Sequence, residues 1–308
     1  MTTVRGQVAV VTGGASGIGR ALAEALAAED CAVVLADVER PALEATAGEL
    51  AAAGARVLAV PCDVARLEDV EALAEVTRER FSEPGLVFLN AGVSPSGALL
   101  ETSARTWRWL LGVNVLGVVH GLSAFGPGLV ARGEGHVVVT SSATGLVPTP
   151  GLGAYSVTKH ALVALAEVLR EELTGTGVGV SVVCPGTVRT KVYESERNRP
   201  ADLAGPSHPD AELLVRYREA VEAAALEPAD LAATVLEAVR DDRFFVLPTD
   251  DVRELAAGRR RSAPRAIRRP GAGPGAVNQS RTEGSRATSA RHMAGKRPTK
   301  LRVLKNPP

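Results

Sequence analysis

The fold is decided by Gln7-Val-Ala-Val-Val-Thr12-Gly13-Gly-Ala-Ser-Gly17-Ile-Gly19, which runs directly into the alanine-rich segment Arg20-Ala-Leu-Ala-Glu-Ala-Leu. Its first six residues are mostly apolar and β-branched, as in a buried parallel strand. A glycine turn follows, and a helix begins at that turn. Backbone N–H groups and the helix dipole at such a junction point towards an anion, and glycine lets the anion approach closely. The stretch therefore predicts a phosphate cradle, although a glycine cluster outside this context would be weak support.

A second apolar run, Ala32-Val-Val-Leu-Ala-Asp37, ends on an acid about 20 residues after the glycines. A carboxylate at that position can accept hydrogen bonds from both hydroxyls of an adenosine ribose and repels a 2′-phosphate. Neither Val38 nor Ser16 is basic, so we expect NAD to be preferred over NADP. The alternative is that Asp37 is a solvated loop residue.

Strand-like and helix-like segments alternate along most of the chain. Uniformly apolar strands in such an alternation are typical of a parallel sheet covered by helices on both faces. We therefore predict an α/β fold, a doubly wound, Rossmann-like parallel sheet of about seven strands in a single domain. The expected strands are residues 7–12, 32–37, 56–61, 85–89, 136–141, 179–184 and 244–247, and the expected helices are 20–29, 41–53, 66–81, 102–130, 154–174, 211–225 and 228–240.

The segment from Ser142 to Lys159 carries the candidate chemistry. Tyr155 and Lys159 lie near the start of a predicted helix, and residues four apart on a helix share a face. The ammonium favours the phenolate, which lowers the tyrosine pKa and makes Tyr155 a candidate general acid/base. Ser142, at the end of the preceding strand, could hydrogen-bond the same substrate oxygen. The alternative is a surface tyrosine and lysine that happen to have helical spacing.

Asn114 lies within the apolar helical segment 102–130. A buried asparagine costs stability unless its amide is hydrogen-bonded, so it is either a functional residue or a satisfied core asparagine. Trp107 and Trp109 point to different helix faces, which places one in the core and the other near a pocket or interface.

The formal net charge of zero conceals a charge division, because residues 251–308 hold 15 Lys and Arg against 3 Asp and Glu. We expect an acidic catalytic domain over residues 1–250 and a basic, disordered tail over 251–308 with too few apolar residues to fold. The tail could contact nucleic acid, an acidic membrane surface or the acidic body of the protein. A solvated extension without a partner is equally compatible with the composition.

The cysteines Cys31, Cys62 and Cys184 lie in or beside apolar runs and lack metal-ligand spacing. We expect them to be reduced and buried in a cytoplasmic protein, with no metal site. The N-terminus shows no secretory signal pattern. No run of about 20 uninterrupted apolar residues suggests a membrane span.

With these segments in order, residues 7–247 resemble the short-chain dehydrogenase/reductase superfamily, in its single-domain branch of about 250 residues. Thr12 to Gly19 is similar to the family's cofactor turn, and Asn114, Ser142, Tyr155 and Lys159 are similar to its catalytic tetrad. One departure is Leu89, where many members have a second asparagine before Asn90-Ala-Gly92. The resemblance implies cofactor contacts from Gly13, Ser16, Gly17, Ile18, Gly19, Asp37, Asp63, Val64, Asn90, Ala91, Gly92, Tyr155, Lys159, Pro185, Gly186, Val188 and Thr190.

The resemblance also implies roles for these residues. Tyr155 would be the acid/base on a carbonyl or alcohol oxygen that Ser142 orients. Lys159 would lower the tyrosine pKa and bind the nicotinamide ribose, while Asn114 would hold a water that links the lysine to solvent. Asp63 and Val64 are expected at the adenine, and Val188 and Thr190 at the carboxamide.

The favoured function is an NAD-dependent oxidoreductase that acts on a secondary alcohol or its ketone. Apolar residues on the pocket rim, from segments 93–97, 143–147 and 191–210, weakly favour a hydrophobic or ring-shaped substrate. One alternative is a non-catalytic dinucleotide-binding or regulatory protein on the same fold, and another is nucleic-acid binding through the basic tail. The family implies a homodimer or homotetramer assembled through helices 102–130 and 154–174.

Overall fold

A seven-stranded, entirely parallel sheet forms the centre of the protein, in the order β3-β2-β1-β4-β5-β6-β7. The computed structural model describes residues 2–204, 215, 219, 223 and 225–262. The predicted tail beyond residue 262, and most of segment 205–224, lie outside the described residues. The strands are β1 Val8–Thr12, β2 Ala32–Asp37, β3 Arg56–Pro61, β4 Leu86–Leu89, β5 Gly135–Thr140, β6 Val178–Val183 and β7 Phe245–Val246.

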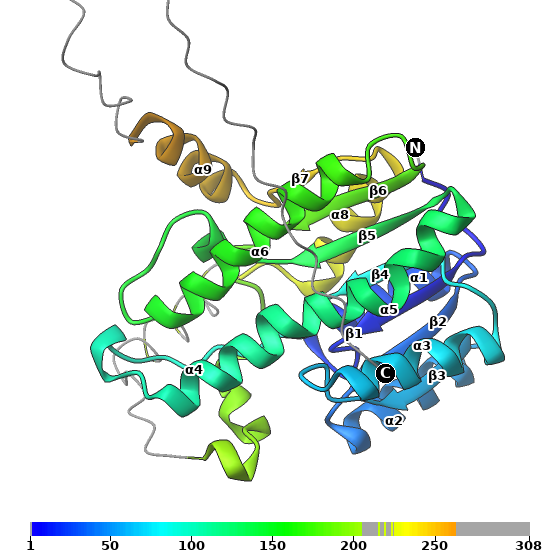
Figure 1. Ribbon diagram of the computed structural model, residues 1–308, viewed down its shortest axis with the longest axis horizontal. Coiled ribbons are helices and arrows are strands. Elements are labelled where there is room, and N and C mark those ends of the chain that lie inside the picture. Colours follow the sequence, from blue (N-terminus) through cyan, green and yellow to red (C-terminus); the bar gives the residue numbers. More distant parts are fainter. Residues whose placement is uncertain (1, 205–214, 216–218, 220–222, 224, 263–308) are drawn as a thin grey trace, which may run out of the picture. The chain divides into compact units, whose positions relative to one another are not determined.

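Helices cover both faces of this sheet, which confirms the predicted doubly wound architecture (Figure 1). One face packs against α1, α2 and α8, and the other against α3, α5 and α6. Buried Ala, Val and Leu dominate both layers, as the low aromatic content required. The helices are α1 Gly17–Ala28, α2 Arg40–Ala52, α3 Leu67–Arg80, α4 Ala104–Leu110, α5 Gly117–Arg132, α6 Gly153–Glu172, α8 Pro228–Arg240 and α9 Asp250–Ser262.

The chain switches direction across the sheet between β1 and β4. After β3 the strand order continues on the other side of β1. In a doubly wound sheet the crevice at this reversal, beyond the carboxyl ends of the strands, is where ligands bind. The topology therefore predicts that the site lies beyond the ends of β1 and β4.

Helices α4 and α5 are joined by a π-helical segment, η2 Leu111–Leu116, into one stretch from Ala104 to Arg132. Among the described residues, this is one helix whose length and mean hydropathy of 1.5 would suffice for a membrane span. Buried core helices meet the same criteria, and here Val118, Phe125 and Leu129 pack against the sheet. Its length and composition are therefore compatible with a helix that packs in the core.

Helix α9 differs from the sequence prediction, which assigned residues from 251 onward to a disordered tail. Residues Asp250–Ser262 are helical, and the side chain of Val252 is fully buried against β6 residues and Leu146. One apolar contact of this kind is not visible as a sequence pattern, because the surrounding segment is strongly charged.

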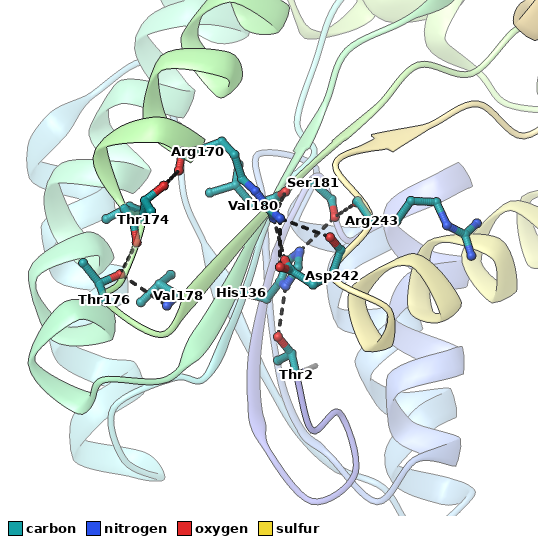
Figure 2. Close-up of polar contacts among 11 residues, drawn as sticks. Thr2, His136, Arg170, Thr174, Thr176, Val178, Val180, Ser181, Asp242 and Arg243 are labelled. Atoms are coloured by element: carbon teal, nitrogen blue, oxygen red, sulfur yellow. Dashed lines mark hydrogen bonds and ion pairs between the residues drawn. The ribbon is translucent and has the colours of Figure 1, made fainter.

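The amino end of the sheet contains a buried polar cluster around His136 (Figure 2). The Ser181 hydroxyl donates to the Arg243 carbonyl at 2.6 Å, so it accepts from Nε2 of His136 at 2.8 Å. The Nδ1 atom then accepts from the Thr2 hydroxyl at 3.2 Å. This network fixes His136 as the neutral Nε2–H tautomer.

A charged pair borders this histidine. Arg170 on α6 holds the Asp242 carboxylate in a bidentate contact at 2.5 and 2.8 Å. Gly179 leaves room for His136 and Asp242, because a Cβ there would lie 2.3 Å from Nδ1 of His136 and 2.6 Å from Oδ1 of Asp242. Burial lowers the pKa of His136 to about 4 from its usual 6.5; Asp242 opposes that shift, while Arg170 and the N-terminal amine reinforce it.

We predict that this histidine makes the protein sensitive to acid. Since the folded pKa is depressed, the stabilisation is present above pH 6.5 and is lost as pH falls towards about 4. Between pH 7.5 and 4.5 the loss should reach ~2–3 kcal/mol of unfolding free energy, most of what a shift of this size is worth. In urea titrations between pH 7.5 and 4.5, wild type and the control His160→Gln should lose this unfolding free energy as pH falls. His136→Gln should not show this loss. Equal slopes in all three proteins would contradict the prediction.

Candidate active site

A cavity of about 550 Å³ opens beyond the carboxyl ends of the strands, at the position that the topology predicts. It brings together most of the residues singled out in the sequence. Those lining it are Gly13, Ser16, Gly17, Ile18, Asp37, Asp63, Val64, Asn90, Ala91, Gly92, Ser142, Tyr155, Lys159, Pro185, Gly186, Val188 and Thr190. Gly19 and Asn114, the remaining two, lie behind its wall.

Glycine is required in the first turn for a different structural reason at each position. Gly13 and Gly17 have φ angles of +69° and +52°, which side chains rarely adopt. A Cβ on Gly17 would lie 3.0 Å from the side chain of Thr190, and one on Gly19 only 2.0 Å from the Gly13 carbonyl oxygen. Gly19 is therefore a packing residue that lets α1 approach the turn.

Two threonines that the sequence analysis did not single out join the strand ends at the floor of the cavity. The Thr12 hydroxyl accepts from the backbone N–H groups of Asn90 and Ala91 at 2.9 and 3.1 Å. The Asn90 amide donates to the Thr12 carbonyl, and its oxygen accepts from the Thr140 hydroxyl at 3.1 Å. Asn90 thus links β1, β4 and β5, and the only sequence signal for Thr12 was its place before the glycines.

Asp37 projects from the end of β2 into the same cavity. Its Oδ2 accepts from the backbone N–H of Ala15 at 3.0 Å, and its Oδ1 from that of Glu39 at 3.0 Å. Each carboxylate oxygen can accept a further bond, so these contacts orient Asp37 and leave it able to bind hydroxyl groups.

The loop at Asp63 and Val64 is held by residues outside the predicted set. The Val64 carbonyl bonds Nδ1 of His120 at 2.9 Å, and a Cβ on Gly117 would lie 2.7 Å from the Val64 side chain. Helix α5 therefore sets the position of this wall. No sequence pattern predicts a contact between residues 64 and 120, which only the packing of α5 creates.

Tyr155 and Lys159 lie on the first turns of α6, and both are buried. The lysine Nζ is 5.6 Å from the centre of the tyrosine ring and donates to the Thr140 carbonyl at 2.8 Å. Burial lowers the pKa of Lys159 to about 8 from 10.5, although the nearby Cys184 thiol opposes the shift. The amine is therefore still mainly protonated at pH 7.

Ser142 lies just past the end of β5 and lines the same cavity as Tyr155. Its Oγ accepts from the backbone N–H of Thr144 at 3.2 Å, which leaves its own proton available to a ligand in the cavity. The neighbouring Ser141 is turned inward and donates to the Lys159 carbonyl at 2.8 Å. This bond holds α6 to the segment that follows β5, and Ser142, Tyr155 and Lys159 all line the cavity.

Asn114 lies in the π-helical segment and is fully buried. Its Oδ1 accepts from the backbone N–H of Val93, and its Nδ2 donates to the Val93 carbonyl and to the Thr158 hydroxyl. The amide is thus satisfied by the chain itself and clamps the loop after β4 to α6. The water-holding role implied by the resemblance stays a prediction.

Residues 191–204, which we call the strap, line one side of the cavity. They contain two short 3-10 helices, η4 Val192–Asn198 and η5 Ala201–Leu203. The Ser195 hydroxyl accepts from the Ser94 N–H at 2.9 Å, and the Arg199 guanidinium stacks 4.3 Å above the ring of Trp109. Trp109 is the buried member of the tryptophan pair and lines the cavity, while Trp107 is half-buried.

The three cysteines are buried and free, as predicted. Burial raises the pKa values of Cys62 and Cys184 to about 12, so both thiols are neutral at pH 7. Within the described ranges, no three His, Cys, Asp or Glu side chains are grouped so that they could hold a metal ion.

A parallel doubly wound sheet with a glycine turn after β1, an acid at the end of β2, and Ser, Tyr and Lys side chains lining one cavity is typical of a dinucleotide-binding oxidoreductase. Comparison with known proteins agrees. A family model described as short chain dehydrogenase matches residues 7–201. The protein belongs to the short-chain dehydrogenase/reductase superfamily.

Relatives and solved structures extend this match over most of the chain. The chain is 32% identical over 256 residues to the C alpha-dehydrogenase of Sphingobium sp. strain SYK-6, covering 82% of this chain and 84% of that protein. It is 38% identical to the 1-deoxy-11-beta-hydroxypentalenate dehydrogenase of Streptomyces exfoliatus, covering 80% and 84%. A short-chain dehydrogenase/reductase from Burkholderia phymatum, solved in complex with NAD, has a TM-score of 0.80 at 40% identity, covering 83% and 94%.

We predict that Lys159→Met raises the unfolding free energy at pH 7, measured without added nucleotide, by ~1–3 kcal/mol because a buried charge is removed. The depressed pKa of Lys159 means that burial costs stability below about pH 8 and less as pH rises towards 10.5. The gain should therefore shrink between pH 7 and pH 9.5 in urea titrations. Lys191→Met, at an exposed lysine, serves as the control. A destabilised Lys159→Met protein would refute this account.

Proposed function

We propose that the protein transfers a hydride between NAD(H) and a secondary alcohol or its ketone. The observation that carries this proposal is that Ser142, Tyr155 and Lys159 line one cavity together with the first glycine turn, with the Lys159 Nζ atom 5.6 Å from the centre of the Tyr155 ring. A bound nicotinamide supplies the hydride chemistry, and the protein supplies position and proton transfer.

In this proposal Tyr155 is the general acid/base. Its hydroxyl exchanges a proton with the substrate oxygen, which the Ser142 hydroxyl orients by a hydrogen bond. The Lys159 ammonium, 5.6 Å from the tyrosine ring centre, favours the phenolate and so brings the tyrosine closer to its working protonation state. Burial strengthens this electrostatic effect, because water screens it less. The remaining ammonium protons can reach ribose hydroxyls.

The proposed residues for the rest of the cofactor follow the cavity wall. The first glycine turn would hold the pyrophosphate, Asp37 the adenosine ribose, and Asp63 with Val64 the adenine. Pro185, Gly186, Val188 and Thr190 would border the nicotinamide. Two observations support the choice of NAD over NADP: the Burkholderia relative was solved in complex with NAD, and backbone bonds orient Asp37 into the cavity.

The proposed substrate is hydrophobic or ring-shaped. Apart from the polar wall, the substrate side of the cavity is lined by the apolar or aromatic residues Val93, Trp109, Val113, Tyr193 and Leu203. A dehydrogenase of a pentalenate derivative among the relatives is compatible with such a substrate.

We also propose a homodimer or homotetramer built on α4, α5 and α6. The outward faces of α5, of α6 and of η2, which joins α4 to α5, expose Leu111, Leu116, Val119, Val157 and Val168, each by 37–56%. Apolar side chains gathered on neighbouring helices favour contact with a second copy.

A cytoplasmic location is proposed from the three unpaired cysteines.

The alternative function is a dinucleotide-binding regulator without chemistry. The orientation of Ser142, Tyr155 and Lys159 towards one cavity favours the enzyme, because a binding protein does not need an acid/base pair. Nucleic-acid binding through the tail concerns residues outside the described part of the chain.

We predict that Tyr155→Phe lowers turnover by at least ~10²-fold, the usual cost of losing a positioned acid/base. Substrates would first be found by following nicotinamide absorbance with a set of secondary alcohols and ketones and both cofactors. The affinity for NADH should change little, which separates chemistry from binding. Turnover within a few-fold of wild type would refute the role of Tyr155.

We predict that the protein binds NAD at least ~10-fold more tightly than NADP in a fluorescence titration, because Asp37 repels a 2′-phosphate. Asp37→Asn keeps the size of the side chain and removes its charge. It should weaken NAD binding and reduce the difference in affinity between NAD and NADP. Tighter binding of NADP by the wild-type protein would overturn the assignment.

A further inference from the structure

The strap has a third anchor, on the opposite side of the cavity from the other two. Ser195 and Arg199 attach it to the loop after β4 and to α4. Between them in sequence, Arg197 and Asn198 reach Glu39, the second residue after the ribose-directed Asp37. These partners are 158 and 159 residues apart, and all three line the cavity.

The contact at Glu39, which we call the clasp, consists of three hydrogen bonds. The Arg197 guanidinium donates to Oε1 of Glu39 at 2.6 Å and to Oε2 at 3.3 Å, and the Asn198 amide donates to Oε1 at 2.8 Å. Arg197 also donates to the Lys191 carbonyl, which stiffens the strap behind the clasp. Burial raises the pKa of Glu39, but its bonds to Arg197 and Asn198 outweigh this effect and lower it overall, so the carboxylate is charged at pH 7.

The clasp closes the mouth of the cavity across the path of the cofactor. The strap begins directly after Thr190, whose side chain lies close to Gly17 of the phosphate turn. It reaches the other side of the cavity at Glu39, the residue whose N–H orients Asp37. The space between these two points is the part of the cavity assigned to the pyrophosphate and adenosine ribose. A dinucleotide in that space lies beneath the crossing segment.

We propose that the Glu39, Arg197 and Asn198 clasp is a gate that must open for the nicotinamide dinucleotide to enter or leave, while the Ser195 and Arg199 anchors keep the substrate wall in place. The proposal rests on the cofactor assignment above. Glu39 and Arg197 have side-chain exposures of 27% and 34%, so water and salt can compete for the pair and the gate can open repeatedly. Arg199 is far less exposed, at 7%, and its stacking on Trp109 does not depend on the clasp.

The test is the rate of NADH release from the full-length protein, measured by stopped-flow displacement for wild type, Glu39→Gln, Arg197→Gln and the double variant. Each single variant should release NADH about three- to tenfold faster, in line with the loss of a partly exposed bidentate pair. The double variant should be no faster than either single one, because both remove the same contact. Raising the salt concentration should speed release from wild type more than from Glu39→Gln. Glu44→Gln, which removes an acid paired with Arg40 on the surface of α2, should behave as wild type.

Two results would overturn the gate. If Arg197→Gln speeds release but Glu39→Gln slows it, Arg197 binds the cofactor directly and Glu39 only competes with it. If all variants match wild type, the clasp does not limit exchange. Failure of every variant and of wild type to bind NADH or NADPH would instead refute the cofactor assignment and the gate with it.

Discussion

The site depends on a cation held inside the protein. Lys159 is almost fully buried, with Thr140 as its hydrogen-bonded partner on the chain, and burial lowers its pKa to about 8. An ammonium in such surroundings is costly to the fold. The same low polarity makes its field strong at Tyr155, since water does not screen it. The Ser141 hydroxyl, bonded to the Lys159 carbonyl, holds this part of α6 to the segment that follows β5.

The two ends of the sheet serve different purposes. At the amino end, the polar groups around His136 are matched with one another and join β5, β6, α6 and the start of the chain, so they contribute to stability. At the carboxyl end, Asp37, Ser142 and Lys159 keep bonding capacity that the chain does not use, and the cavity lies there. Polar groups left open to a ligand are the usual mark of a binding edge in parallel sheets.

The departure of Leu89 from the family pattern is explained by packing. The side chain of Leu89 is buried in β4, and a Cβ on Gly121 of α5 would lie 2.3 Å from it. A glycine on the helix thus makes room for a leucine where many relatives have an asparagine. Because Asn90 itself bonds both Thr12 and Thr140, the strand ends remain joined without a second asparagine.

The sequence by itself determined the parallel α/β fold, the strand and helix order, and most of the cavity wall, because these follow from local periodicity and from glycines and polar residues at strand ends. Tertiary structure alone decided the contacts between distant residues: Thr12 with Asn90, His120 with Val64, and Glu39 with Arg197. It also decided that Asn114 is satisfied by the chain and that Val252 anchors α9. Such pairs leave no periodic pattern, since their geometry arises only when the helices pack on the sheet and the strap crosses the cavity.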